Sequence, residues 1–257
     1  MILTDTHTHL YLEDFDSDRD ALMQQALAQD IQRFFLPNID TTSVDSLLSL
    51  TQKYPANCFA MMGLHPCSVK ENYAEELSKI NETLNLKRES IYAVGEIGMD
   101  LYWDKTFVKE QEITFITQCH WADEMNLPIV IHSRNSTDEL IAIIKNQDHL
   151  QLKGIFHCFS GNLQQAKEVI DLGFYLGIGG VVTFKNSGLD KVVEQIDLKH
   201  LVLETDAPYL APAPHRGKRN IPEYLKLVAE KIAAIKNITL EDVASVTTEN
   251  SKKIFGV

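Results

Sequence analysis

Two histidines near the start of the chain are spaced so that both could bind one metal ion. His7 and His9 lie in the segment TDTHTHLY, residues 4–11, with one residue between them. Side chains alternate between the two faces of an extended strand, so this spacing puts both imidazoles on one face if the segment is extended. A polar turn that contains two histidines by chance would look the same. Any further ligands must therefore come from other parts of the chain.

More residues of metal-binding type follow short apolar segments along the chain. They are Glu96 in VGEIGMD, His132 in IHSR, His157 in FHCFSG and Asp206 in LETDAP. A mixture of imidazole and carboxylate suits Zn²⁺ or Mn²⁺ and, with more water, Mg²⁺. Together with His7 and His9 these residues offer more ligands than one catalytic ion normally takes from a protein. Two ions roughly 3.5–4 Å apart that share a carboxylate would use all six, as in enzymes that cleave phosphoesters.

We therefore predict a site for two divalent metal ions, Mg²⁺, Mn²⁺ or Zn²⁺. Glu96 is the expected bridge, because it stands alone between the two groups of histidines along the chain. Asp206 is expected to bind a metal and to take the proton from the attacking water. Both acidic residues are thus predicted to be catalytic.

The elements that would position these residues are strands that alternate with helices. Strands are predicted over 1–7, 31–37, 58–63, 91–96, 128–132, 154–158, 174–179 and 200–205. Helical patterns cover 17–29, 107–125, 136–146, 162–172, 189–196, 222–236 and 239–254. Eight apolar strands alternating with helices favour parallel βαβ units.

This count predicts an α/β fold, a (β/α)8 TIM barrel formed as one domain over residues 1–257. An open sheet with an added C-terminal helical part is the alternative. No GxGxxG follows the first strand and no Walker motif occurs, which argues against the commonest nucleotide-binding folds. In a TIM barrel the active site lies at the carboxyl ends of the strands, where the predicted ligands fall.

Strand alternation indicates which residues would accompany the ligands into the barrel. Leu3 and Asp5 share the face of His7, and Glu204 shares the face of Asp206. By the same rule Val130 and Ile155 point inward with His132 and His157, whereas Cys158 turns outward to pack beneath the helices. Asp5 and Glu204 lie one layer deeper than the ligands, where they could orient a metal-bound imidazole.

Composition limits the classes of function. The chain of 257 residues is 44% hydrophobic and carries a formal charge of −12, which argues against a large interface with nucleic acid phosphates. It contains no apolar run of the roughly 20 residues that a membrane span needs, and no signal peptide is visible. Four cysteines without a CxxC pair predict reduced thiols in a cytoplasmic protein. We expect no membrane contact, and no obligate protein partner is evident from the sequence.

Six motifs, in order along the whole chain, resemble those of the TatD family of metal-dependent hydrolases. They are DTHTHL, GLHP, AVGEIGMD, IHSR, FHCFSG and ETDAPYLAP followed by HRGKRN. The resemblance implies a TIM barrel of the amidohydrolase-like type and a metal-dependent deoxyribonuclease activity. It implies the same six metal ligands, and it adds substrate contacts by His65, Arg134, Arg216 and Lys218. The family often has Cys and Asp where this chain has Thr8 and Tyr11.

The expected activity is hydrolysis of phosphodiester bonds at the ends of DNA or a short oligonucleotide. A deacylase that acts on amides, esters or aminoacyl-RNA could use the same barrel and ligands, and a non-catalytic metal-binding protein is a more distant alternative. No Lys occupies a strand end where its carboxylation could bridge two metals, which argues against urease-like enzymes. Tyr102 and Trp103, on the loop after the fourth strand, could stack a base or merely close the top of the barrel.

Overall fold

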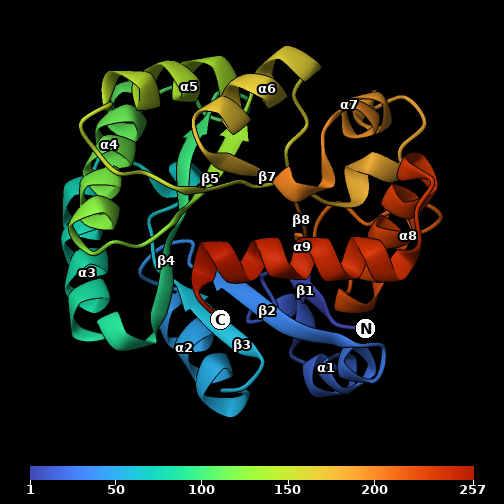
Figure 1. Ribbon diagram of the computed structural model, residues 1–257. Coiled ribbons are helices and arrows are strands. Elements are labelled where there is room, and N and C mark those ends of the chain that lie inside the picture. Colours follow the sequence, from blue (N-terminus) through green and yellow to red (C-terminus); the bar gives the residue numbers. More distant parts are fainter.

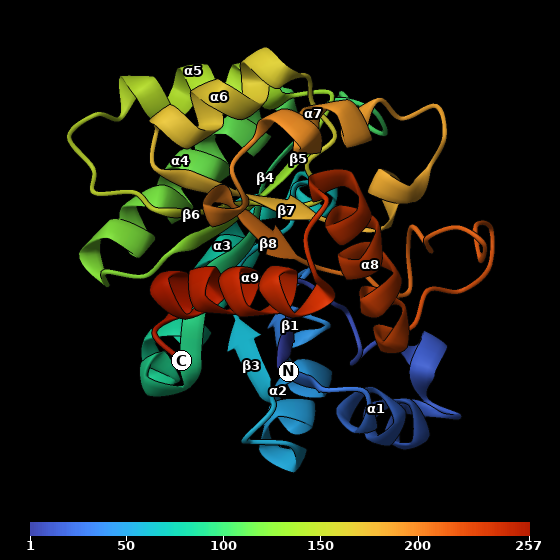
Figure 2. The same ribbon diagram turned by 45° about the vertical axis from the view of Figure 1, so that its right-hand side comes forward.

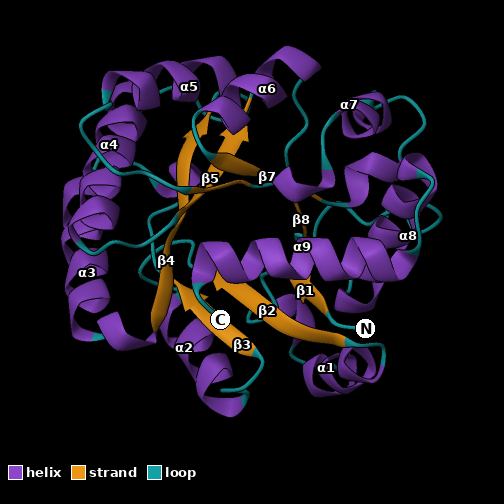
Figure 3. Ribbon diagram, in the orientation of Figure 1, coloured by secondary structure: helices purple, strands orange, loops and turns teal.

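The computed structural model describes residues 1–257 and places eight parallel strands inside a ring of helices (Figures 1 and 3). The strands are β1 Leu3–Asp5, β2 Ile31–Pro37, β3 Cys58–Met61, β4 Ile91–Asp100, β5 Ile129–Arg134, β6 Gly154–Phe156, β7 Phe174–Ile178 and β8 Leu201–Leu203. The helices are α1 Arg19–Ala28, α2 Val44–Lys53, α3 Tyr73–Leu86, α4 Val108–Glu124, α5 Thr137–Asn146, α6 Leu163–Asp171, α7 Leu189–Gln195, α8 Leu225–Lys236 and α9 Leu240–Phe255.

The strands follow one another around the sheet in sequence order, β1 to β8, and every ladder is parallel. Two hydrogen bonds join the segments at the carboxyl ends of β1 and β8. The N–H of Thr6 donates to the carbonyl of Leu203 at 2.9 Å, and the N–H of Asp206 donates to that of His7 at 2.8 Å. The sheet is therefore a nearly closed barrel, which confirms the predicted (β/α)8 fold.

Side chains on the two faces of each strand form two separate cores. The interior of the barrel holds a small apolar cluster that includes Phe35, Phe59, Met61, Ala93, Val130, Ile155 and Val202. Their neighbours along the strands, such as Phe34 and Leu36, belong to the larger cluster between the barrel and its helices. Burial of both faces explains why the strands are apolar almost throughout.

Helix α9 covers the amino-terminal end of the barrel. Figures 1 and 2 show it lying across the strands on the side where both termini are found. Phe255 at its end packs into the interior cluster and stacks on Phe35, with ring centroids 3.8 Å apart. The predicted site residues lie at the opposite end of the barrel, where the strands have their carboxyl ends.

The predicted inward positions are partly confirmed. Val130 and Ile155 belong to the interior cluster, as expected. The prediction for Leu3 was wrong, because Leu3 packs in the outer cluster. The register of β1 against β2 shifts between Leu3 and Thr4, so simple alternation does not carry from Leu3 to His7.

Element bounds differ from the predicted ranges mainly at the carboxyl ends of the strands. β1 ends at Asp5 rather than at residue 7, and β6 ends at Phe156 rather than at residue 158. β4 runs further than predicted, to Asp100. Helices α2 and α3 lie outside the predicted ranges, although α3 buries Leu77, Ile80 and Leu84 at helical spacing.

The structure also bears on the cysteines and on membrane spans. All four cysteines are free thiols. None of the helices has the length and apolar character that a membrane span requires.

Candidate metal centre

His7 and His9 are held by backbone pairing beyond the end of β1. The carbonyl of His7 accepts the N–H of Asp206, and the N–H of His9 donates to the carbonyl of Ala207, both at 2.8 Å. The segment thus continues alongside the residues that follow β8. Both histidines are almost fully buried. This pairing brings the first histidines and the last acidic ligand of the chain to the same place.

Four atoms form a first group of candidate metal ligands, from His7, His9, Asp206 and the Oε2 atom of Glu96. The Nε2 atom of His7 lies 3.1 Å from Glu96 Oε2 and 3.7 Å from Asp206 Oδ1. The Nε2 atom of His9 lies 3.6 and 3.5 Å from the same two oxygens. Ligands about 2.1 Å from a tetrahedral ion are roughly 3.4 Å apart, so these four atoms fit around one ion.

The other oxygen of Glu96 faces a second ligand group, made of His132, His157 and Glu96 Oε1. His132 Nδ1 lies 2.8 Å and His157 Nε2 lies 2.7 Å from this oxygen. The two imidazole nitrogens are 3.4 Å from each other. Glu96 therefore presents one carboxylate oxygen to each group of histidines.

An irregularity in β4 turns Glu96 into the barrel. Ala93 points into the interior cluster, whereas Val94 and Ile97 pack on the outside. Strict alternation from Ala93 would point Glu96 outward, but the register of β4 against β5 shifts between Gly95 and Ile97. A side chain at Gly95 would meet Val130 at 2.9 Å, so the close approach of β4 and β5 requires glycine there.

The imidazoles of the second group are backed by carboxylates. His132 Nε2 lies 2.9 Å from Asp100 Oδ2, and His157 Nδ1 lies 3.6 Å from Glu204 Oε1. The hydrogen bond to Asp100 would fix the tautomer of His132 as a ligand and raise its basicity, whereas Nδ1 of His157 makes no hydrogen bond. Asp100 was absent from the predicted site. Its spacing from Glu96 was the available signal, because both lie on the same face of β4 beyond the bulge.

The imidazoles of the first group have neutral partners or none. His9 Nδ1 lies 3.0 Å from the hydroxyl of Tyr11, which donates to the carbonyl of Pro37 at 2.6 Å. The phenol oxygen is therefore free to accept the Nδ1 proton of His9. The Nδ1 atom of His7 is buried without a hydrogen-bond partner.

His65 lies beside the second group but differs from the ligands in its hydrogen bonding. Its Nε2 atom is 3.3 Å from both Glu96 Oε1 and His132 Nδ1. Its Nδ1 atom accepts the backbone N–H of Cys67 at 3.0 Å. A neutral His65 must therefore carry its proton on Nε2, which makes it a hydrogen-bond donor toward the centre rather than a ligand.

The two deeper acidic residues differ in their contacts. The Oε1 atom of Glu204 lies 3.6 Å from Nδ1 of His157 and is not hydrogen-bonded to it. Asp5 accepts hydrogen bonds from the N–H and the hydroxyl of Thr205, at 2.9 and 2.6 Å, and from the N–H of His7 at 3.3 Å. It touches no imidazole, so its orienting role is exerted on the backbone that joins β1 to β8.

Cys158 does not pack beneath the helices as predicted. β6 has ended at Phe156, and Cys158 has a positive φ of 45°, so the alternation no longer applies. The residue is only partly buried, and its N–H donates to Glu204 Oε1. Cys158 therefore helps to hold the carboxylate that backs His157.

The basic residues predicted to contact substrate are exposed. The guanidinium of Arg134 lies 4.8 Å from the centroid of the Tyr102 ring, and that of Arg216 lies 4.5 Å from the Phe184 ring. Lys218 is also exposed. The neighbouring Arg219 is instead bound to Asp18 and does not offer a free cation.

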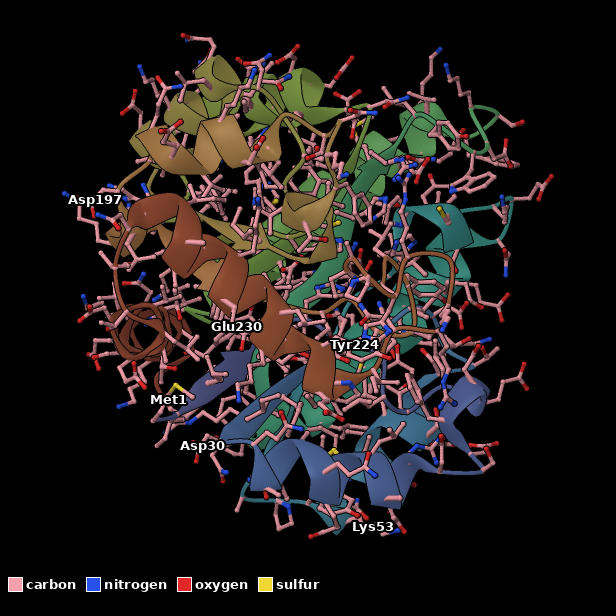
Figure 4. The ribbon with its side chains drawn as sticks, turned by 90° about the vertical axis from the view of Figure 1, so that its right-hand side faces the viewer. Met1, Asp30, Lys53, Asp197, Tyr224 and Glu230 are labelled. Carbon is pink, nitrogen blue, oxygen red and sulfur yellow. The ribbon has the colours of Figure 1, made fainter.

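One contact anchors the loop that carries Arg216 and Lys218. His215 stacks on Tyr224, labelled in Figure 4 just before α8, with ring centroids 4.1 Å apart. The loop therefore begins from a fixed point beside α8.

Electrostatics favour a cation at the centre. Burial opposes ionisation of Glu96, but the imidazoles of His157, His65 and His7 outweigh it and hold its pKa well below the usual value. Burial likewise opposes ionisation of Asp206, and the hydrogen bond from His9 and the nearby imidazoles lower its pKa. Histidines are the groups that lower the pKa values of both buried carboxylates. The donor set therefore fits divalent cations. Three triads of side chains at the centre have their candidate ligand atoms within 4.8 Å of one another: His7–His157–Asp206, His7–His9–Glu96 and His65–Glu96–His132.

Comparison with known proteins identifies the family. The family model described as TatD related DNase matches residues 4–256. This chain belongs to the TatD family. It is 39% identical to the metal-dependent hydrolase YabD of Bacillus subtilis over the full length of both chains. It is 33% identical to the metal-dependent hydrolase YcfH of Escherichia coli, over 100% of this chain and 97% of that one.

A solved structure of a TatD-family relative has the same fold. The YjjV protein of Escherichia coli, a TatD homologue, superposes with a TM-score of 0.93 at 29% identity, over 99% of this chain and 98% of that one. The resemblance to the TatD family inferred from the motifs is thus confirmed. This TatD-family chain is a metal-dependent hydrolase.

Proposed function

We propose that this TatD-family hydrolase cleaves phosphodiester bonds at the ends of DNA strands, using two divalent ions bridged by Glu96. The observation that carries the proposal is the orientation of that one carboxylate. Its Oε2 atom faces His7 at 3.1 Å, and its Oε1 atom faces His157 at 2.7 Å. When bound, a pair of divalent ions polarises a phosphate and lowers the pKa of water.

The remaining steps fall to side chains around the ligands. Asp206 is ionised at neutral pH because its pKa is lowered, so its carboxylate can accept the proton of the attacking water. His65 can donate its Nε2 proton in a hydrogen bond to a phosphate oxygen. Arg134, Arg216 and Lys218 would neutralise phosphate charge at the rim.

DNA is the favoured substrate for two reasons. The family model carries the description DNase. A chain with a formal charge of −12 suits a substrate held by a few nucleotides in a cleft better than a duplex wrapped over a broad surface. The free cysteines also support a reducing cytoplasmic location, where the enzyme would encounter DNA ends.

The test is cleavage of end-labelled single-stranded and duplex oligonucleotides by the purified protein with Mg²⁺, Mn²⁺ or Zn²⁺. We expect shortening from an end, and its loss in Asp206→Asn. Asp148→Asn is the matched control, because Asp148 is an exposed carboxylate on the loop after α5. Intact DNA with every metal, together with hydrolysis of an aminoacyl or simple ester substrate that depends on Asp206, would replace this proposal with a deacylase.

A further inference from the structure

Two aromatic side chains stand exposed on the loop that follows β4. The exposed fraction is 51% for Tyr102 and 73% for Trp103. Their rings meet edge to face, with centroids 4.8 Å apart and an interplanar angle of 85°. Large aromatic side chains are normally buried, so a pair held in water at one place indicates a surface that another molecule covers.

The aromatic pair is tied to the metal centre by a single carboxylate. One oxygen of Asp100, Oδ2, lies 2.9 Å from Nε2 of His132. The other, Oδ1, accepts the backbone N–H groups of Tyr102 at 2.9 Å and of Trp103 at 3.0 Å. The side chain that orients a metal ligand therefore also fixes the loop that carries the aromatic rings.

The far side of the loop is held as well. Lys70 donates to Asp104 Oδ2 at 2.7 Å, and its ammonium group lies 5.6 Å from the centroid of the Phe107 ring. The N–H of Thr106 donates to the other oxygen of Asp104 at 2.9 Å. Contacts at both ends of the loop keep the exposed rings in a defined place relative to the metal ligands.

A cation lies beside the pair. The guanidinium of Arg134, two residues beyond His132 in β5, is 4.8 Å from the centroid of the Tyr102 ring. Trp103 is the more exposed of the two aromatic residues. Proteins that hold single-stranded nucleic acid combine such features, because bases stack on aromatic faces while arginine meets the backbone.

We propose that Tyr102 and Trp103 form a stacking platform for an unpaired nucleobase adjacent to the phosphate that is cleaved, with Trp103 as the main contact. The inference rests on the proposed function and deepens it, since it makes the substrate a strand end whose last bases are unpaired. A base inside a duplex has both faces covered by its neighbours and cannot stack on the platform. Stacking also supplies affinity to an acidic chain that offers few phosphate contacts.

The test measures binding rather than turnover. The probes are a single-stranded hexanucleotide with phosphorothioate linkages, which slow hydrolysis, and the same backbone without bases. We expect Trp103→Ala to weaken binding of the hexanucleotide roughly 5- to 100-fold and Trp103→Phe to weaken it less. The abasic probe should bind wild type and Trp103→Ala equally. Leu86→Ala is the matched control, because Leu86 on α3 is 74% exposed and should leave both affinities unchanged.

Equal binding of the hexanucleotide to wild type and Trp103→Ala would overturn the platform. A loss that is the same for the abasic probe would also overturn it, because the effect would not depend on a base. If wild type trims DNA and either result is found, the platform fails while the proposed function stands. If wild type trims no DNA but the base-dependent loss is seen, the platform stands and the reaction must be revised. If a second protein binds over Trp103 and the affinity for the hexanucleotide does not change, the surface is a protein interface instead.

Discussion

The two ligand groups share Glu96 but are supported by different surroundings. In the second group His132 is hydrogen-bonded to the carboxylate of Asp100 at 2.9 Å, whereas Nδ1 of His157 lies 3.6 Å from Glu204 and makes no hydrogen bond. In the first group His9 meets only the neutral phenol of Tyr11, and the remote nitrogen of His7 has no partner. Charged acceptors form hydrogen bonds roughly twice as strong as neutral ones, and they make a histidine a better electron donor to a metal.

This difference indicates how the proposed centre would hold two ions with unequal strength. We expect unequal affinities, because the first group offers four ligand atoms with two carboxylate oxygens and the second group offers three with one. The first group also contains Asp206, the proposed proton acceptor.

The largest effect is expected from Glu96→Gln, which removes the shared charge from both groups. We expect metal binding to weaken at both sites. The loss of hydrolytic activity should exceed the roughly 10- to 100-fold cost typical of an outer partner. Elemental analysis and turnover of a phosphodiester substrate measure the two effects. Glu112→Gln, an exposed glutamate on α4, is the control. Full metal content in Glu96→Gln would show that the Glu96 carboxylate does not bridge two ions.

Asp100→Asn should have the next largest effect, because it replaces a charged partner of His132 by a neutral one of the same shape. We expect the affinity of the second group for its ion to fall roughly 10- to 100-fold, with the first group unchanged. Competition with a chelating dye measures both affinities. An equal weakening of the two ions would contradict the assignment of Asp100 to one group.

Tyr11→Phe should act on the first group and act more weakly. It removes the hydroxyl that meets His9, but the lost acceptor is neutral, so we expect less than a roughly 10-fold loss of affinity. The same dye competition applies. A loss as large as that of Asp100→Asn would remove the distinction between the two groups.

His65→Gln should have the smallest effect on metal binding. Because His65 Nδ1 is occupied by the N–H of Cys67, its Nε2 carries a proton and does not ligate. We expect unchanged metal content and reduced turnover. Loss of one ion per chain in this variant would make His65 a ligand of the second group.

Much of this centre could be predicted from the sequence, because the ligands follow apolar strands and parallel strands end at one rim. His7, His132 and His157 were located by that rule. The chemistry around them was harder to predict. The inward turn of Glu96 depends on a register shift at Gly95, and no periodicity in the sequence marks it.

The outer partners depend on tertiary contacts of single atoms. In the sequence Tyr11 is only a departure from the family pattern. In the structure its hydroxyl contacts Nδ1 of His9 and donates to the carbonyl of Pro37. Leu3 and Cys158 were misplaced because alternation was extended across a shift in register and past the end of a strand. Rules of periodicity hold within an element and fail at its ends, where this site is built.

The most direct test of a bridged centre is the number of metal ions bound per chain. Elemental analysis of the wild-type protein, saturated with Mn²⁺ or Zn²⁺ and freed of excess metal, provides it. We expect two ions per chain, with one lost before the other on mild chelation. A single tightly bound ion at saturation would contradict it and would reduce Glu96 to a ligand of one metal.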